Sequence, residues 1–247
     1  MKIGIGAGSQ VKKVVASIRG LTRDITVICY APSGTRDQFP ADVCVVEHDQ
    51  PEQALVSDLA SGVIDAAVRG TLPASSTLTL LKRAMGVERL ERVALLETGN
   101  GARFLLAPVG VDEGWTISEK LALIEKSRTV ARRFDLDERT AVLSGGRMSD
   151  VGRHERVDTT LAEAELVARL AGADHAEILI EDAVRDHGII IAPDGICGNL
   201  IFRTLVLLGG GVGHGAPIVN IDRIFVDTSR ASPDYANAIL LASSLVK

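Results

Sequence analysis

The chain lacks several features that mark common classes of protein. No uninterrupted apolar run reaches the ~18 residues of a membrane span. Aromatic residues make up only 3% of the chain and the net charge is −5, which argues against nucleic acid as a partner. The three cysteines have no CxxC spacing and the five histidines share no metal-ligand spacing, so we expect no metal site.

The first residues, MKIGIGAGSQ, enter a strand-like segment at once, without the regions of a secretory signal. Together with three cysteines that do not pair by spacing, this start predicts a cytoplasmic protein with no membrane partner. Two nucleotide-binding motifs are also missing. Gly4, Gly6 and Gly8 do not give the GxGxxG spacing, and no GxxxxGK[ST] sequence occurs, so a tight turn from strand to helix is the simplest reading of GIGAGS.

Short β-rich runs alternate with amphipathic helical windows along the whole chain. This alternation predicts an α/β protein with mostly parallel sheets covered on both faces, and the length favours two lobes. The expected strands are KIGIGAG, DITVICYA, ADVCVVEH, IDAAVRG, RVALLETG, RFLLAPVG, RTAVLSGG, AEILIED, GIIIAP, APIVNI and RIFVDTS.

Three helices carry boundary signals. An i, i+3, i+4, i+7 apolar stripe from Val11 to Ile18 predicts a helix that stops at Gly20. Thr116 with Glu119, and Thr160 with Glu163, have capping-box spacing and predict two further helix starts. The nearly uncharged stretch from Leu200 to Leu208 predicts a helix buried between other elements.

A Gly-Asn-Gly turn between RVALLET and ARFLLAPVG predicts an antiparallel hairpin, where we expect the chain to cross between lobes. The predicted domains are residues 1–104 plus 222–247, and residues 105–221. Apolar helices near 200–208 and 236–246 suggest a homodimer, although burial between the lobes would explain them equally.

Ligands of parallel α/β proteins collect where strands end and helices begin. The polar residues at such ends are candidates for binding a small anionic substrate: Arg69, Ser144, Arg147, Gly198 and Asn199. His214, in the glycine-rich GGGVGHG, is a further candidate, either at a cleft or in a solvated loop.

The last strand, RIFVDTS, ends in Ser229 and Arg230 before a predicted helix. A hydroxyl beside a guanidinium at a helix start is a common anion-binding combination, although Arg230 pairing with a carboxylate and Ser229 acting as a cap would explain the residues equally. Asp234 is a candidate general base, or an acidic residue that the helix dipole favours at a helix start.

The order of these residues resembles the phosphate acetyl/butyryl transferase family. The matching pattern is Gly198 with Asn199, the basic Arg203, Gly209 with Gly210, Gly215, and Ser229 with Arg230; DAAVRGTLPASST upstream also resembles that family. The resemblance implies two α/β/α lobes of the isocitrate and isopropylmalate dehydrogenase type, with an active-site cleft between them. It further implies acyl exchange between coenzyme A, as a substrate, and orthophosphate. Ser229 and Arg230 would then hold phosphate and Asp234 would be the base.

Arg203 stands where that family has lysine, Ala231 stands where it usually has glycine, and the chain is shorter. In these respects the chain is more similar to the MtxX group, or methanogenesis marker protein 4, whose members are described as methyltransferase-related. Three functions therefore stay open: a phosphate acyltransferase, a subunit of a methanogen methyltransferase system linked to tetrahydromethanopterin or a corrinoid protein, with partner subunits, and a non-catalytic anion- or cofactor-binding protein.

Overall fold

The computed structural model describes residues 1–21 and 25–246 and divides the chain into two compact units. Unit 1 comprises residues 1–90 and 214–247, and unit 2 comprises residues 91–213. The predicted boundaries after residues 104 and 221 lie later in the chain. The first difference arises because the predicted hairpin is not split: both of its strands belong to unit 2.

Unit 1 contains a sheet in the order β3-β2-β1-β4-β11-β10. All neighbours in this sheet are parallel except β10 and β11. The strands are β1 (Lys2–Gly6), β2 (Thr26–Ala31), β3 (Cys44–Glu47), β4 (Ala66–Val68), β10 (Val212–Pro217) and β11 (Ile224–Asp227). Of β10, residues 214–217 belong to unit 1. The helical segments are α1 (Val11–Arg19), η1 (Arg36–Gln38), α2 (Pro51–Ser61), α3 (Ala74–Met85) and α8 (Ala236–Val246).

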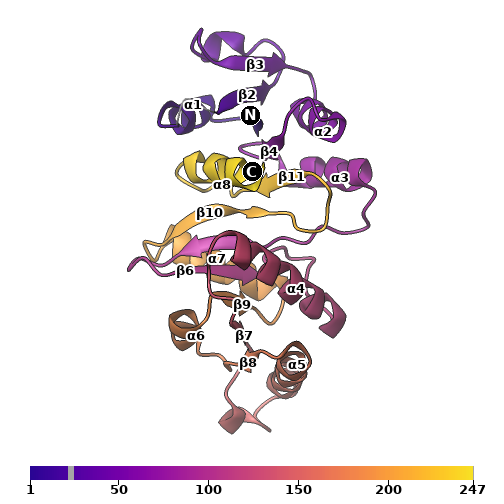
Figure 1. Cartoon of the computed structure of the whole chain (residues 1–247), viewed down its shortest axis with the longest axis vertical. Coiled ribbons are helices and arrows are strands. Elements are labelled where there is room, and N and C mark those ends of the chain that lie inside the picture. Colours follow the sequence, from indigo (N-terminus) through magenta and orange to yellow (C-terminus); the bar gives the residue numbers. More distant parts are fainter. Residues whose placement is uncertain (22–24, 247) are drawn as a thin grey trace. The chain divides into compact units, whose positions relative to one another are not determined.

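Helices cover both faces of this sheet, with α1 and α8 on one side and α2 and α3 on the other (Figure 1). The yellow C-terminal segment, β11 and α8, lies beside the violet β4 although most of the chain separates them (Figure 1). The core is aliphatic, with Leu55, Leu59 and Ile64 fully buried around Phe225. Burial of such side chains stabilises the fold by about 1.5–3 kcal/mol each.

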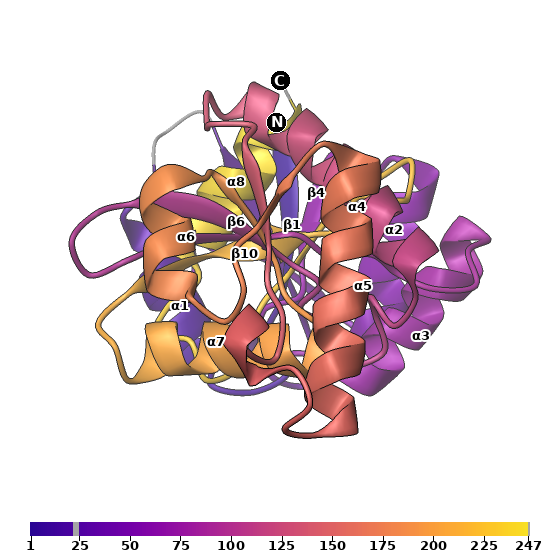
Figure 2. The ribbon, with the colours of Figure 1, turned by 90° about the horizontal axis from the view of Figure 1, so that it is seen from below.

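Unit 2 contains a second sheet in the order β5-β6-β9-β7-β8. Its strands are β5 (Ala94–Glu97), β6 (Arg103–Ala107), β7 (Thr140–Val142), β8 (Asp174–His175) and β9 (Ile189–Ile191). Its helical segments are α4 (Ile117–Arg133), η2 (Met148–Asp150), α5 (Glu155–Ala171), α6 (Ile180–Asp186) and α7 (Gly195–Leu207). Within this unit α4 and α5 lie on one side, and α6 and α7 on the other (Figure 2).

Several sequence predictions are confirmed. β5 and β6 form the antiparallel hairpin, and the remaining strand pairs of unit 2 are parallel. The helix α1 ends at Gly20. Thr116 caps α4 by accepting a hydrogen bond from the Glu119 amide.

Three local predictions are wrong. AEILIED forms a turn and the start of α6, because a short apolar run fits a helix as well as a strand. Thr160 lies inside α5, which begins at Glu155 with His154 as its cap. The helix α7 is not fully buried, since Leu200 is 59% exposed. None of the helices within residues 1–21 and 25–246 is long and apolar enough to cross a membrane.

Candidate functional site

The carboxyl ends of β1, β4 and β11 meet at one edge of the unit 1 sheet, because these strands are parallel neighbours. The segments that follow them are residues 7–10, 69–73 and 228–235. They contain Arg69, Ser229, Arg230 and Asp234, so the structure brings these four predicted residues to the same edge. We call this the unit 1 edge.

Arg69 ties the segments together. It is 5% exposed, and its Nε donates to the carboxylate of Asp227, the last residue of β11. Its Nη1 donates to the Leu72 carbonyl at 2.8 Å, and its Nη2 donates to the Thr228 carbonyl. Three of the five N–H donors of this guanidinium are therefore used to position the ends of β4 and β11.

The Ser229–Arg230 segment is held from α1. Lys13 Nζ donates to the carbonyls of Arg230 and Ser232, at 2.7 and 2.9 Å. Ser229 Oγ accepts from the Ala231 amide at 3.2 Å. Within residues 1–21 and 25–246 the exposed Arg230 guanidinium forms no hydrogen bond or ion pair. Lys13 thus fixes the backbone of this segment, whereas the Arg230 guanidinium remains available to bind a ligand.

Asp234 lies two residues before the first residue of α8. Its Oδ1 accepts from the amide of Ala236, the first residue of α8, at 3.0 Å. The side chain is exposed, and its negative charge acts on Lys13. Partial burial lowers the pKa of Lys13, and Asp234 opposes that shift.

Sequence reasoning missed Tyr235 at the same edge. Its side chain is buried, and Lys13 Nζ lies 5.0 Å from the centre of its ring. Its hydroxyl has no hydrogen-bond partner among the described residues. Burial raises the pKa of Tyr235, whereas the charges of Arg69 and Arg230 lower it, so the phenol is within the field of both guanidinium groups. A buried hydroxyl without a partner is costly, and such groups often have a functional cause.

His214 lies in β10, which runs antiparallel to β11 with Ala216 opposite Asp227. His214 precedes this pair by two residues in β10. Gly215, between His214 and Ala216, has φ +110°, and a Cβ there would lie 2.5 Å from Val226 Cγ1. Only glycine fits this backbone at this distance.

Gly198, Asn199 and Arg203 lie on α7 of unit 2, after β9. A Cβ on Gly198 would lie 1.9 Å from the Pro108 carbonyl oxygen, so this glycine allows α7 to approach the segment that follows β6. Asn199 Nδ2 donates to the Val109 carbonyl at 3.1 Å. Arg203 is exposed. In this structure Gly198 and Asn199 therefore position the chain between β6 and α4.

Ser144 and Arg147 follow β7 in unit 2. Ser144 is 2% exposed, and its Oγ lies 3.0 Å from both the Gly146 carbonyl oxygen and His175 Nε2. Arg147 is exposed, and its amide donates to Asp150 Oδ2 at 2.9 Å. Sequence reasoning missed His175 because its partners are distant in the chain.

Cys29 and Cys197 do not offer a reactive thiolate. Burial raises the pKa of Cys197, which lies in α7, to about 11, and Asp194 adds to the shift. Burial also raises the pKa of Cys29 to about 12. Among the described residues no three His, Cys, Asp or Glu side chains form a cluster that could hold a metal ion.

No protein-family model matches the chain. It is 50% identical to the "Putative methyltransferase mtx subunit X" of Methanosarcina barkeri over 214 residues, which cover 85% of this chain and 79% of that protein. It is 37% identical over 260 residues to an uncharacterized methyltransferase of Methanopyrus kandleri, with 99% of each covered.

Solved structures show the same fold at low identity. A branched-chain phosphotransacylase from Enterococcus faecalis gives a TM-score of 0.77 at 18% identity, covering 100% of this chain and 99% of that one. A phosphotransacetylase from Streptococcus pyogenes gives 0.69 at 18% identity, covering 100% and 94%. An isocitrate dehydrogenase from Methylococcus capsulatus gives 0.52 at 12% identity, covering 99% and 84%. The predicted fold class is confirmed.

Proposed function

Since this chain belongs to the family of the mtx subunit X proteins and has the fold of the phosphotransacylases, we propose that it is a transferase that binds a small anion at the unit 1 edge. The proposed reaction is acyl exchange between a coenzyme A thioester and orthophosphate. Coenzyme A is a substrate in this proposal.

One observation carries the proposal: the Arg230 guanidinium is exposed and unpaired within the described residues, on a segment whose backbone is already fixed by Lys13. Arginine binds phosphate oxygens through two parallel N–H donors, which are charge-assisted and therefore strong. Arg69 supports this arrangement by holding the preceding strand ends, while its own charge is paired with Asp227.

The remaining residues fit the same chemistry. In the proposed exchange a phosphate oxygen attacks the thioester carbonyl carbon, the C–S bond breaks, and the thiolate leaves as coenzyme A. Arg230 and Ser229 would hold the attacking phosphate, and Asp234 would accept its proton. The Tyr235 hydroxyl would complete the site as a donor to the anion, which would give this buried phenol its missing partner.

A second candidate is methyl transfer within a methanogen methyltransferase system. It is favoured by the names of the relatives, three of which are Methanosarcina proteins named as subunit X of a methyltransferase. In that case the same edge would bind an anionic group of a pterin or thiol cofactor, and turnover would need partner subunits. Tight anion binding without any turnover would instead identify a non-catalytic binding protein.

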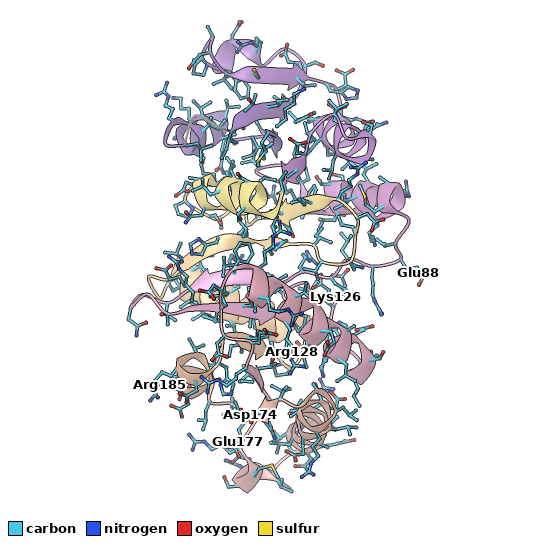
Figure 3. All side chains as sticks on the ribbon, in the orientation of Figure 1. Glu88, Lys126, Arg128, Asp174, Glu177 and Arg185 are labelled. Atoms are coloured by element: carbon cyan, nitrogen blue, oxygen red, sulfur yellow. The ribbon has the colours of Figure 1, made fainter. Side chains whose placement is uncertain are left out.

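The first test is ligand-dependent thermal stability, with orthophosphate and coenzyme A added separately and together. A ligand at 100 times its Kd stabilises the native state by about 2.7 kcal/mol. We expect phosphate to raise the Tm of the wild type and to have no effect on Arg230→Ala. Arg185→Ala is a matched control, because this exposed arginine belongs to a local pair with Asp182 on α6 (Figure 3).

Formation of acyl phosphate from an acyl-coenzyme A, lost in Arg230→Ala, would establish the acyltransferase reaction. No Tm response to phosphate in the wild type would refute the anion site. A rise in Tm with phosphate but no acyl exchange would refute the acyltransferase reaction. It would favour methyl transfer or a non-catalytic binding protein.

A further inference from the structure

In unit 2 a serine, a histidine and a glutamate are joined by hydrogen bonds. They are separate from the residues that we propose bind phosphate with Arg230. Ser144 follows β7, His175 is the last residue of β8, and Glu165 lies on α5. The strands β7 and β8 are parallel, with Val142 opposite His175, so the segment after β7 passes beside the histidine. In Figure 3 the labelled Asp174 and Glu177 mark the chain on either side of His175.

The distances define one chain of hydrogen bonds. His175 Nε2 lies 3.0 Å from Ser144 Oγ, and His175 Nδ1 lies 3.2 Å from Glu165 Oε2. The imidazole is held between the two, with its side chain 7% exposed. Nucleophile, base and orienting carboxylate in this sequence are the arrangement that activates a serine hydroxyl.

The charges favour the required proton positions. Hydrogen bonds from Arg169, at 2.8 Å, and from His175 lower the pKa of Glu165, which is therefore ionised at neutral pH. An ionised carboxylate only accepts hydrogen bonds, so His175 Nδ1 must carry the proton. In the neutral imidazole Nε2 then presents its lone pair to the Ser144 hydroxyl. The single hydroxyl hydrogen can be donated either to Nε2 or to the Gly146 carbonyl oxygen, each 3.0 Å from Oγ, and the proposed attack uses the first of these bonds.

The turn after Ser144 also offers a backbone donor. The Gly145 amide already donates to Thr160 Oγ1 at 2.9 Å. The Gly146 amide, two positions after Ser144, has no partner among the described residues, and we assign it as the candidate donor to an oxyanion. Ser144 itself is only 2% exposed, so an acyl donor reaches Oγ only when the turn after Ser144 opens, and a short acyl group needs the smallest opening.

We propose that Ser144 is a second reactive centre of the chain, which accepts a short acyl group from an activated ester or thioester. Ser144 Oγ attacks the carbonyl carbon while its proton passes to His175 Nε2. The bond to the leaving group breaks, and that group takes the proton from His175. Water then attacks the serine ester, His175 takes a proton from the water and returns one to Ser144 Oγ, and a carboxylic acid is released.

Ser144 and His175 are the catalytic residues of this step, and Glu165 is a positioning residue. The proposal does not depend on phosphate binding at Arg230. Labelling of Ser144 and the phosphate-dependent rise in Tm are therefore separate readouts, and the two proposals can fail separately.

The test uses two small probes on the full chain: p-nitrophenyl acetate for turnover, and a fluorophosphonate for covalent labelling located by peptide mass spectrometry. We expect label on the peptide that contains Ser144 and none in Ser144→Ala. His175→Gln should slow labelling about 100-fold or more, which is the usual size of a general-base effect.

Glu165→Gln separates positioning from folding, because the Glu165 side chain is 43% exposed and glutamine keeps its size while removing its charge. We expect this variant to keep its Tm and to shift the pH profile of labelling. Ser33→Ala, which removes an exposed hydroxyl bonded to Asp49, is the matched serine control and should label like the wild type.

The absence of label on Ser144 in the folded wild type would overturn the proposal. So would labelling that is unchanged in both His175→Gln and Glu165→Gln. Either result would leave the three side chains as a structural link between β7, β8 and α5.

Discussion

Each unit fixes the segments at the carboxyl edge of its sheet with a buried arginine–carboxylate pair. In unit 1 the pair is Arg69 with Asp227, and in unit 2 it is Arg92 with Glu113. Glu113 also accepts from the Gly110 amide, so it holds the segment after β6 much as Arg69 holds the segment after β4. The two units thus use the same kind of ion pair to fix their backbone.

The two units differ in the side chains that remain available at the edge of the sheet. At the unit 1 edge a guanidinium is exposed near a buried phenol, which suits a ligand that brings negative charge. In unit 2 the hydroxyl of Ser144 is already bonded to His175, which suits proton transfer. Two units with the same architecture can therefore support different chemistry, because the chemistry depends on the few side chains that the ion pairs do not use.

The largest expected effect comes from breaking the unit 1 pair. Asp227→Ala should lower the free energy of unfolding by about 3–5 kcal/mol, because it leaves the Arg69 charge buried without its carboxylate. Glu113→Ala should cost less, about 1–3 kcal/mol, because Arg92 keeps Asp112 at 3.1 Å. Urea unfolding with hydrogen exchange resolved by unit would measure both. Equal losses would contradict the difference that we assign to Asp112.

The next effect concerns backbone approach in unit 2. Gly198→Ala should destabilise the protein by about 1–3 kcal/mol, because the new Cβ would overlap the Pro108 carbonyl and must displace α7. Gly20→Ala is the matched control. No atom of the described residues lies within 4 Å of the new atom there, so its stability should stay within about 0.5 kcal/mol of the wild type. Equal melting temperatures for the two variants would refute this packing argument.

A smaller effect should distinguish the two tyrosines of unit 1. Tyr30 donates to Asp58 Oδ2 at 2.7 Å, so Tyr30→Phe should lose about 1–2 kcal/mol. Tyr235→Phe removes a hydroxyl without a partner among the described residues, so its stability should be unchanged or higher by up to about 1 kcal/mol. The same variant should weaken phosphate binding. A stability loss equal to that of Tyr30→Phe would argue against the proposed role of Tyr235.

The smallest effects are the pH dependences, which should have opposite signs in the two units. Burial raises the pKa of Glu113 against the opposing effect of Arg92, so the folded state binds more protons and stability falls as pH rises from about 4.3 through the raised pKa. The lowered pKa of Lys13 makes stability rise with pH as that pKa is passed, towards about 10.4. Glu113→Gln and Lys13→Met should each remove the corresponding slope in urea midpoints measured across pH. An unchanged slope in either variant would contradict the assignment.

Much of the fold could be predicted because its signals are local. The Gly-Asn-Gly turn specifies the β5–β6 hairpin, and Thr116 with Glu119 marks the start of α4 by its own hydrogen bond. The prediction failed where two local readings compete. Ile178 to Ile180 is too short an apolar run to separate strand from helix, and Thr160 has capping spacing although an earlier cap, His154, begins α5.

The candidate sites could be predicted only in part. Ser229, Arg230 and Asp234 are neighbours in the chain, so their pattern is visible in the sequence. Lys13 reaches Arg230 across 217 positions, and His175 reaches Ser144 across 31. Such partners are chosen by strand order and register, which no single window of sequence contains.

The late position of β11 in the chain affects how the two units fold during synthesis. Unit 2 is continuous in the chain, whereas the unit 1 sheet needs β11, which is made late, to pair with β4. On the ribosome unit 2 can therefore fold while unit 1 still waits for its last strands. During that interval β4 exposes an unpaired edge to other nascent chains, and such edges invite aggregation. The arrangement predicts that slow translation or truncation near residue 214 harms the N-terminal half of the chain more than the unit that has just been completed.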